Sequence, residues 1–358
     1  MILIVGGGPA GSLSAIALRK FDVTIVEEHQ SPGFPVQCAG LVSERCYREL
    51  RRFSDCKLNK IRGAVFFSKN ESVELEGRCG GVVVERKVLD RDLFAKASEF
   101  ANVMVKTKFL NARKKIAELL SYGKRFEVEY DFILGADGVY SRVAKVFGFE
   151  RPKIYSAVQV TSRFDYFSDD LVEIYLGFSD FLCYSIPLDG FAKIGAISSK
   201  NPMQVLKRLL RWLGKRVKGC VLELNVGAIP IGIVNFVGDN VMLMGDSAGM
   251  VKPYTGGGLY YIVKAVEKLK HFPNLKMIRR EYLRDLGMEY KIGMRIARLY
   301  GVLKPEDYDY MIGVLKEHSD LARELDMDKP STILKFIPTI LKIVKRRSVM
   351  MKLISLLV

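Results

Sequence analysis

The chain has 358 residues, of which 49% are hydrophobic and 27% are charged, and its formal net charge is +16. Hydrophobic segments along the whole length exclude a disordered chain, and the length predicts two domains or one large domain with an insertion. The positive charge attracts phosphates or an anionic membrane surface, but no helix-turn-helix, zinc-finger or RNP-like motif accompanies it, so we expect no nucleic-acid partner.

The cysteines and the start of the chain bear on metal binding and on the location of the protein. The 6 cysteines contain no C-x-x-C pair and the 3 histidines do not cluster with them, so we expect no metal site. An apolar run, Ile2–Val5, follows Met1 directly, without the basic region and long apolar region of a signal peptide. We therefore expect a cytoplasmic protein.

The first segment, MILIVGGGPAGSLSAIALRKFDVTIVEE, has the pattern strand, glycine turn, helix and second strand. Its turn satisfies G-x-G-x-x-G with Gly6, Gly8 and Gly11, and Ala10 lies within it. Gly6 permits the tight turn, Gly8 lets the backbone approach a pyrophosphate, and Gly11 lets the helix lie close to the sheet. Glu27 follows the second strand, where an acid accepts hydrogen bonds from an adenosine ribose. The segment predicts a dinucleotide site.

Two later segments have the form of a strand that ends in an acidic turn. Residues 132–148 run from an apolar strand into Asp137-Gly138 and a helix. Residues 236–269 run from a strand into Gly245-Asp246, with Gly256-Gly257-Gly258 at the start of a helix. No second G-x-G-x-x-G follows a strand, so we expect no separate nicotinamide domain and a reductant that docks transiently.

The segments after residue 150 change character. Residues 151–235 contain short β-branched and aromatic runs bounded by Gly, Pro and Asp, which predicts an inserted antiparallel sheet. A helix is expected from Pro202 to Gly214, and the chain after 270 has helical patterns. Basic residues interrupt the apolar positions from Ile333 to Val344, so no apolar run in this tail is long enough to form a transmembrane helix. It either lies on an anionic membrane or packs on the protein's own core.

The segments 132–148 and 236–269, together with VVVERKVLDRDLFAKA at 82–97, resemble the two-domain flavoprotein oxidoreductases of the hydroxybenzoate-hydroxylase type. The resemblance implies FAD as cofactor, with Asp246 on the ribityl or ribose hydroxyls and Arg86 in contact with the cofactor. Asp137 and Gly245 belong to the same cofactor segments. The helix that starts at Gly256–Gly258 would face the N1–C2=O edge of the flavin.

Three stretches, PGFPVQCAGLVS, FLCYSIPLDG and GDSAGMVKPYTGGGL, narrow the resemblance to the geranylgeranyl reductase family, and within it to the archaeal enzymes that saturate digeranylgeranylglycerophospholipids. The resemblance implies a hydride from the flavin N5 to one alkene carbon and a proton to the other. It places the loop Cys38-Ala39-Gly40 beside the flavin. Cys38 and Tyr184 are the candidate proton donors, with Tyr254 or a water as others, although a buried cysteine is also common as inert packing.

The sequence departs from this family at one strand, and other functions stay open. The family pattern Y-x-W-x-F-P-x-G aligns with Leu182, Tyr184, Ile186, Pro187 and Asp189, so the size and head group of the lipid are uncertain. The alternatives are an aromatic hydroxylase type of flavin monooxygenase and a membrane-attached flavin electron carrier. The electron donor, which we take to be a ferredoxin, a deazaflavin or NAD(P)H, is not fixed by the sequence.

We therefore expect an α/β protein with a Rossmann-like FAD-binding domain, an inserted antiparallel β-sheet substrate domain and a helical C-terminal region. The FAD-binding domain takes residues 1–150 and 236–270, the substrate domain 151–235 and the helical region 271–358. An isoprenoid lipid is the expected substrate, and residues 330–358 are the expected point of contact with the inner face of the membrane.

Overall fold

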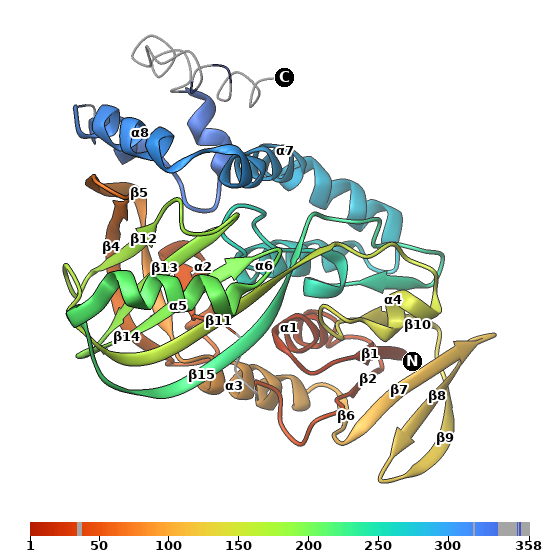
Figure 1. Cartoon of the computed structure of the whole chain (residues 1–358). Helices are drawn as coiled ribbons and strands as arrows, with labels where there is room; N and C mark the ends of the chain where they lie inside the picture. Colours follow the sequence, from red (N-terminus) through yellow and green to blue (C-terminus); the bar gives the residue numbers. More distant parts are fainter. Residues whose placement is uncertain (34–37, 318, 336–348, 350, 352–358) are drawn as a thin grey trace.

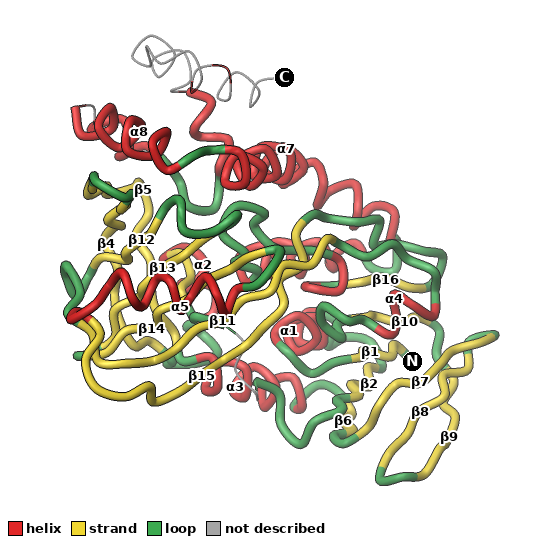
Figure 2. The backbone as a smooth tube through the Cα atoms, in the orientation of Figure 1, coloured by secondary structure: helices red, strands yellow, loops and turns green. Residues whose placement is uncertain are grey.

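The computed structural model describes residues 1–33, 38–317, 319–335, 349 and 351. Figure 1 shows two β-sheet regions side by side, the strands β1, β2 and β10 on the right and the larger group around β13 on the left. Helices α7 and α8 (Leu275–Val302 and Pro305–Glu317) lie across the top of both regions. The tube in Figure 2 shows that the larger region is mostly strand, whereas this top layer is helical.

The first sheet is parallel and has the strand order β16-β10-β1-β2-β6. Helix α1 contacts β1 and β2 and packs against α3 and α6. The strands β1, β2, β10 and β16 are almost wholly buried, which explains why they are continuous apolar runs in the sequence. The bounds are β1 Ile2–Val5, β2 Val23–Val26, β6 Asn102–Met104, β10 Phe132–Gly135, β16 Val241–Leu243, α1 Pro9–Ala17, α3 Arg86–Ser98 and α6 Leu259–Lys268.

The second sheet has the order β15-β11-β14-β13-β12-β4-β5-β3, and its pairs are antiparallel apart from the parallel pair β12/β4. Its bounds are β3 Leu41–Ser43, β4 Lys57–Phe67, β5 Ser72–Val84, β11 Lys153–Phe164, β12 Leu171–Tyr175, β13 Leu182–Leu188, β14 Phe191–Ser198 and β15 Val217–Ile231. Strands β3, β4 and β5 come from the segment 1–150 that we assigned to the FAD-binding domain alone. Their pairing with strands of the segment 151–235 does not follow from the sequence, because alternating hydrophobicity marks a strand but not its partner strand.

The two faces of the second sheet have different neighbours. Val158 and Val160 of β11 pack under helix α5, Pro202–Leu213, whose buried face is formed by Leu206, Leu209 and Leu213. This confirms the helix expected between Pro202 and Gly214. Side chains at the alternate positions of β11 point to the opposite face, where Ala157 belongs to a separate apolar cluster with Tyr184. That second face lies over the first sheet and forms the roof of a cavity.

The remaining elements complete the chain. Their bounds are β7 Thr107–Arg113, β8 Ile116–Ser121, β9 Lys124–Glu129, α2 Glu44–Leu50, α4 Arg142–Val146, and the 3-10 helices Gly214–Arg216, Gly245–Ala248, Leu269–His271, Ser319–Glu324 and Pro330–Lys335. The amphipathic helix expected from Ile333 to Val344 falls mainly outside the described residues. Within the described ranges, every helix is too short or too polar to cross a membrane.

Candidate active site

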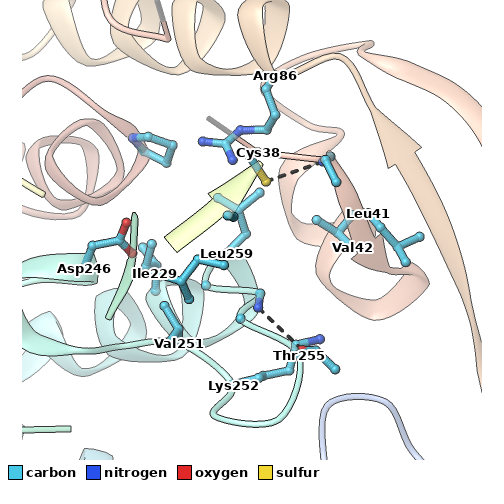
Figure 3. A pocket seen from close by; sticks show the side chains of 18 of the residues that line it. Cys38, Leu41, Val42, Arg86, Ile229, Asp246, Val251, Lys252, Thr255 and Leu259 are labelled. Atoms are coloured by element: carbon cyan, nitrogen blue, oxygen red, sulfur yellow. Dashed lines mark hydrogen bonds between the residues drawn. The ribbon is translucent and has the colours of Figure 1, made fainter. Parts of the chain in front are cut away.

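A cavity of about 500 Å³ lies between the carboxyl ends of the parallel strands and the second sheet. Its floor consists of turn backbone and polar groups from the first sheet, and its roof is almost wholly aliphatic. Figure 3 shows Asp246, Arg86 and Cys38 around this space, with Leu259, Ile229 and Val251 successively lower in the view. The roof side chains are Ala157, Val172, Ile174, Leu182, Tyr184, Ile186, Ile197 and Ile229.

The glycine turn before α1 has the geometry expected of a phosphate-binding turn. Gly6 has φ +103°, and a Cβ placed there would be 2.4 Å from the Ala136 carbonyl oxygen. A Cβ on Gly11 would be 1.9 Å from the Gly6 carbonyl oxygen, so the helix can approach the strand only without a side chain. Gly8 has no atom within 4 Å of a built Cβ and lines the cavity with Ala10. Since no side chain caps α1, its N-terminal N–H groups are open to an anion.

Glu27 lies at the carboxyl end of β2 and lines the cavity, as expected for an acid at a ribose. Its Oε2 accepts a hydrogen bond from the Gly7 N–H at 2.7 Å, and its Oε1 accepts one from the His29 N–H at 2.8 Å. Glu27 is 6% exposed. These bonds fix its orientation, and each carboxylate oxygen retains acceptor capacity for a hydroxyl group.

Asp246 and the start of α6 form the opposite side of the floor. The Asp246 carboxylate lines the cavity and accepts no hydrogen bond from any residue that the structure describes. Burial raises its pKa, an effect that Arg86 partly offsets. Gly256, Gly257 and Gly258 also line the cavity, and no side chain caps α6. The site therefore presents an unpaired acceptor beside an open helix N-terminus, two groups that suit hydroxyls and an anionic edge.

The loop that carries Cys38 lies directly against this space. The Cys38 Sγ accepts the Gly40 N–H at 3.4 Å, and Cys38, Ala39 and Gly40 all line the cavity. The Arg86 guanidinium lies beside Cys38 (Figure 3) and donates hydrogen bonds to both carboxylate oxygens of Asp90, at 2.9 and 3.0 Å. Asp90 thereby orients Arg86 toward the thiol, a function that its place in the sequence pattern did not indicate.

Tyr184 reaches the cavity from β13 and has a partner that sequence analysis missed. Its hydroxyl donates to Gln159 Oε1 at 2.9 Å, while Gln159 Nε2 donates to the Cys38 carbonyl at 3.4 Å. Gln159 thus connects both candidate proton donors. Burial raises the Tyr184 pKa, with a smaller contribution from Cys38, so the phenol keeps its proton. Gly195 of β14 is the one sign of this contact in the sequence: a glycine within a strand indicates a close approach, and a Cβ at Gly195 would be 2.3 Å from the Tyr184 ring.

Four of the expected cofactor residues do not line the cavity: Gly6, Gly11, Asp137 and Gly245. The three glycines act through the backbone, as in the +69° φ of Gly245. The Asp137 carboxylate accepts hydrogen bonds from the Ser141 hydroxyl and from the Arg142 and Val143 N–H groups at 2.6, 2.7 and 3.0 Å. It thereby binds the first turn of α4, whose N-cap is Ser141, and its contact with the cofactor stays a prediction.

The cavity fits FAD on its own geometry. It joins an open phosphate-binding turn at Gly8, a ribose acceptor at Glu27 and an unpaired acceptor at Asp246. Its volume of about 500 Å³ lies within the range of cofactor and ligand pockets. The aliphatic roof opposite the α6 N-terminus leaves a dry face above the position that a flavin ring would take.

Comparison with known proteins agrees with this geometry. Residues 4–47 match the NAD(P)-binding Rossmann-like domain. A digeranylgeranylglycerophospholipid reductase of Methanothrix thermoacetophila is 30% identical, over 74% of this chain and 75% of that protein. An uncharacterised protein of Methanocaldococcus jannaschii is 31% identical over 93% of each chain. A geranylgeranyl bacteriochlorophyll reductase-like protein of Thermoplasma acidophilum superposes with a TM-score of 0.82 at 23% identity, over 95% of this chain and 97% of that one.

The wider fold is shared with other flavoproteins. A flavin-dependent brominase superposes with a TM-score of 0.68 at 16% identity, over 95% of this chain and 98% of that one. The sequence identity to the archaeal reductases and the cavity that accommodates FAD thus lead to one assignment: the chain belongs to the geranylgeranyl reductase family of flavoprotein oxidoreductases.

Proposed function

We propose that this protein uses FAD to saturate carbon–carbon double bonds of geranylgeranyl chains in a membrane-lipid precursor. The observation that carries the proposal is the contrast between the two sides of the cavity, polar at Glu27 and Asp246 and aliphatic across the roof. An isoprenoid chain has no polar group to pair, so it binds best where the wall also has none. The archaeal relative is named for reduction of such a lipid.

Each cavity residue has a defined part in this proposal. When bound, FAD supplies the hydride. Glu27, Asp246 and the start of α1 hold the cofactor, and the roof excludes water from the alkene. Gln159 holds Tyr184 and the Cys38 loop in one arrangement.

The proton requires a donor near the second alkene carbon. The Tyr184 hydroxyl proton is already donated to Gln159, whereas the Cys38 Sγ accepts a hydrogen bond from Gly40. We therefore propose Cys38 as the proton donor and Tyr184 as the residue that positions it through Gln159. A transient reductant of the ferredoxin, deazaflavin or NAD(P)H type would reload the cofactor. The net charge of +16 favours peripheral contact with the anionic inner face of a membrane, which we assign to residues 330–358.

The test uses FAD-loaded protein reduced with dithionite without oxygen. Digeranylgeranylglycerophospholipid is added, and the lipid is analysed by mass spectrometry for the gain of two hydrogen atoms per double bond. Saturated product together with reoxidised flavin is the expected result. An unchanged lipid, with reoxidation only when oxygen is admitted, would instead support a monooxygenase.

The role of Cys38 is tested separately in the same assay. Cys38→Ala should bind FAD and lipid but lose alkene reduction by about 100-fold or more, the typical contribution of a general acid. Cys220→Ala is the matched control, because Cys220 is an exposed thiol that does not line the cavity. Full activity in Cys38→Ala would remove the thiol from the mechanism and leave the reductase proposal standing.

A further inference from the structure

A short segment from the C-terminal region, residues 326–328, crosses one side of the cavity and is called the strap below. Asp326 pairs with Arg45 at 2.9 Å, and Asp328 pairs with Lys252 at 3.1 Å. Between them, Met327 lines the cavity, and its carbonyl oxygen accepts a hydrogen bond from Lys252 Nζ at 3.3 Å. The strap is therefore attached by two ion pairs, of which only the second involves a residue of the cavity wall.

The Lys252 ammonium lies beside the start of α6. Its backbone carbonyl accepts the Gly256 N–H at 2.8 Å, and its Nζ is 3.6 Å from a Cβ built on Gly257. Lys252 lines the cavity, and Figure 3 shows it next to Thr255, in the turn that precedes the helix. Asp328 does not line the cavity. The pair is thus oriented with its positive end toward the cavity and its negative end behind the cavity wall.

Stability alone does not account for this pair. The Lys252 and Asp328 side chains are 5% and 0% exposed, so both charges have lost their hydration. Such burial is offset only when the remaining lone pairs are also satisfied. Asp328 Oδ2 has no hydrogen-bond partner among the described residues. A buried pair left incomplete in this way indicates a role for the charge itself.

We propose that Lys252 sets the reduction potential of the bound flavin and that Asp328 is the counter-charge that limits its effect. A flavin gains negative charge on reduction, and a nearby cation in a partly desolvated site stabilises the reduced form. Lys252 adds its charge to the open N-terminus of α6, and the strap supplies the opposing carboxylate. The inference rests on the FAD of the proposed function and does not depend on the lipid substrate.

The test is the midpoint potential of the protein-bound flavin, measured by reductive titration against a reference dye without lipid. Lys252→Met should lower the potential, with about a tenfold change in the equilibrium constant for reduction, or ~30 mV for a two-electron couple. Lys252→Arg should keep the potential close to that of the unmodified protein. Asp328→Asn should raise it, because the Lys252 charge is then uncompensated.

The matched control is Arg45→Met, which breaks the other ion pair of the strap. Arg45 does not line the cavity, so this variant should lower stability with little change in potential. Equal shifts in Arg45→Met and Lys252→Met would overturn the proposal, since they would show that strap attachment alone governs the flavin. If Lys252→Met does not fold, Asp328→Asn and the Lys252→Met/Asp328→Asn double variant are measured instead. Midpoint potentials unchanged in both of these variants would overturn the proposal. All of these readings stand whether or not the lipid is reduced.

Discussion

The hydrogen bond between Tyr184 and Gln159 predicts a specific energetic coupling. Tyr184→Phe removes the hydroxyl that donates to Gln159 Oε1 at 2.9 Å. The two residues are 9% and 4% exposed, so water has little access to replace the lost donor. A buried acceptor left without a partner costs about 1–3 kcal/mol. The free energy of unfolding should therefore fall by about that amount, although only one oxygen atom is lost.

The Gln159→Leu variant completes a double-mutant cycle, which separates the energy of this hydrogen bond from the other effects of each substitution. Gln159→Leu removes the acceptor together with the amide that donates to the Cys38 carbonyl and to Asn225 Oδ1, both at 3.4 Å. In that background the Tyr184 hydroxyl has already lost its partner, so Tyr184→Phe should cost nothing or restore some stability. The coupling between the two sites should then be about 0.5–3 kcal/mol.

The assay is equilibrium urea denaturation of the FAD-loaded protein for the two single variants and the double variant. Tyr140→Phe is the control for loss of a phenolic hydroxyl, because Tyr140 is 70% exposed, and it should change stability by less than about 0.5 kcal/mol. Additivity of Tyr184→Phe and Gln159→Leu within about 0.3–0.5 kcal/mol would refute the reasoning, because independent sites behave in that way.

Three further predictions concern the floor of the cavity and the thiols. Gly8→Ala should fold normally but lose FAD, because the added Cβ would occupy open space that a pyrophosphate needs. Gly11→Ala should lower the melting temperature, because its Cβ would be 1.9 Å from a carbonyl oxygen. FAD titration measures the first effect, and thermal unfolding measures the second. Burial raises the Asp246 pKa, so ionisation destabilises the folded cofactor-free protein, and Asp246→Asn should stabilise it at neutral pH. This gain should disappear as the pH falls below the ordinary carboxyl pKa of 3.8, as urea denaturation at each pH would show. Burial raises the Cys46 pKa to about 12, so iodoacetamide near neutral pH should not modify Cys46. The partly exposed Cys38 should be modified, unless bound FAD covers it. Peptide mass spectrometry measures the modification of each thiol.

The parts of the site that follow from local backbone constraints could be predicted from the sequence. The glycine turn before α1 and the glycines before α6 are needed where backbone passes close to another group, and each is visible in a few consecutive letters. Asp246 follows shortly after the buried strand β16, in the turn that begins at Gly245, and lines the cavity as expected. The contact of Asp137 with the start of α4 is equally local, since Ser141, the N-cap of that helix, follows it by four residues.

The rest of the site depends on partners that are distant in the chain. Gln159 looks like any polar residue of a strand until β14 brings it and Tyr184 to the two sides of Gly195, across which the Tyr184 hydroxyl reaches Gln159. Lys252 is one of many basic residues in the sequence, and its burial and its contacts with Asp328 and Met327 distinguish it only in the structure. The pairing of β4 with β12 is likewise invisible in either strand, because period-two alternation defines a buried face and leaves the neighbouring strand unspecified.

The cavity has a consequence for how the protein acquires its cofactor. Gly8 and Met327 line the same space, together with roof residues from the segment between them. During synthesis the phosphate-binding turn emerges before these walls, so the space that would hold a flavin is incomplete until residue 327 has been made. We therefore expect FAD to be bound only after that point, and a chain truncated before the strap should have the nucleotide turn without an enclosed site.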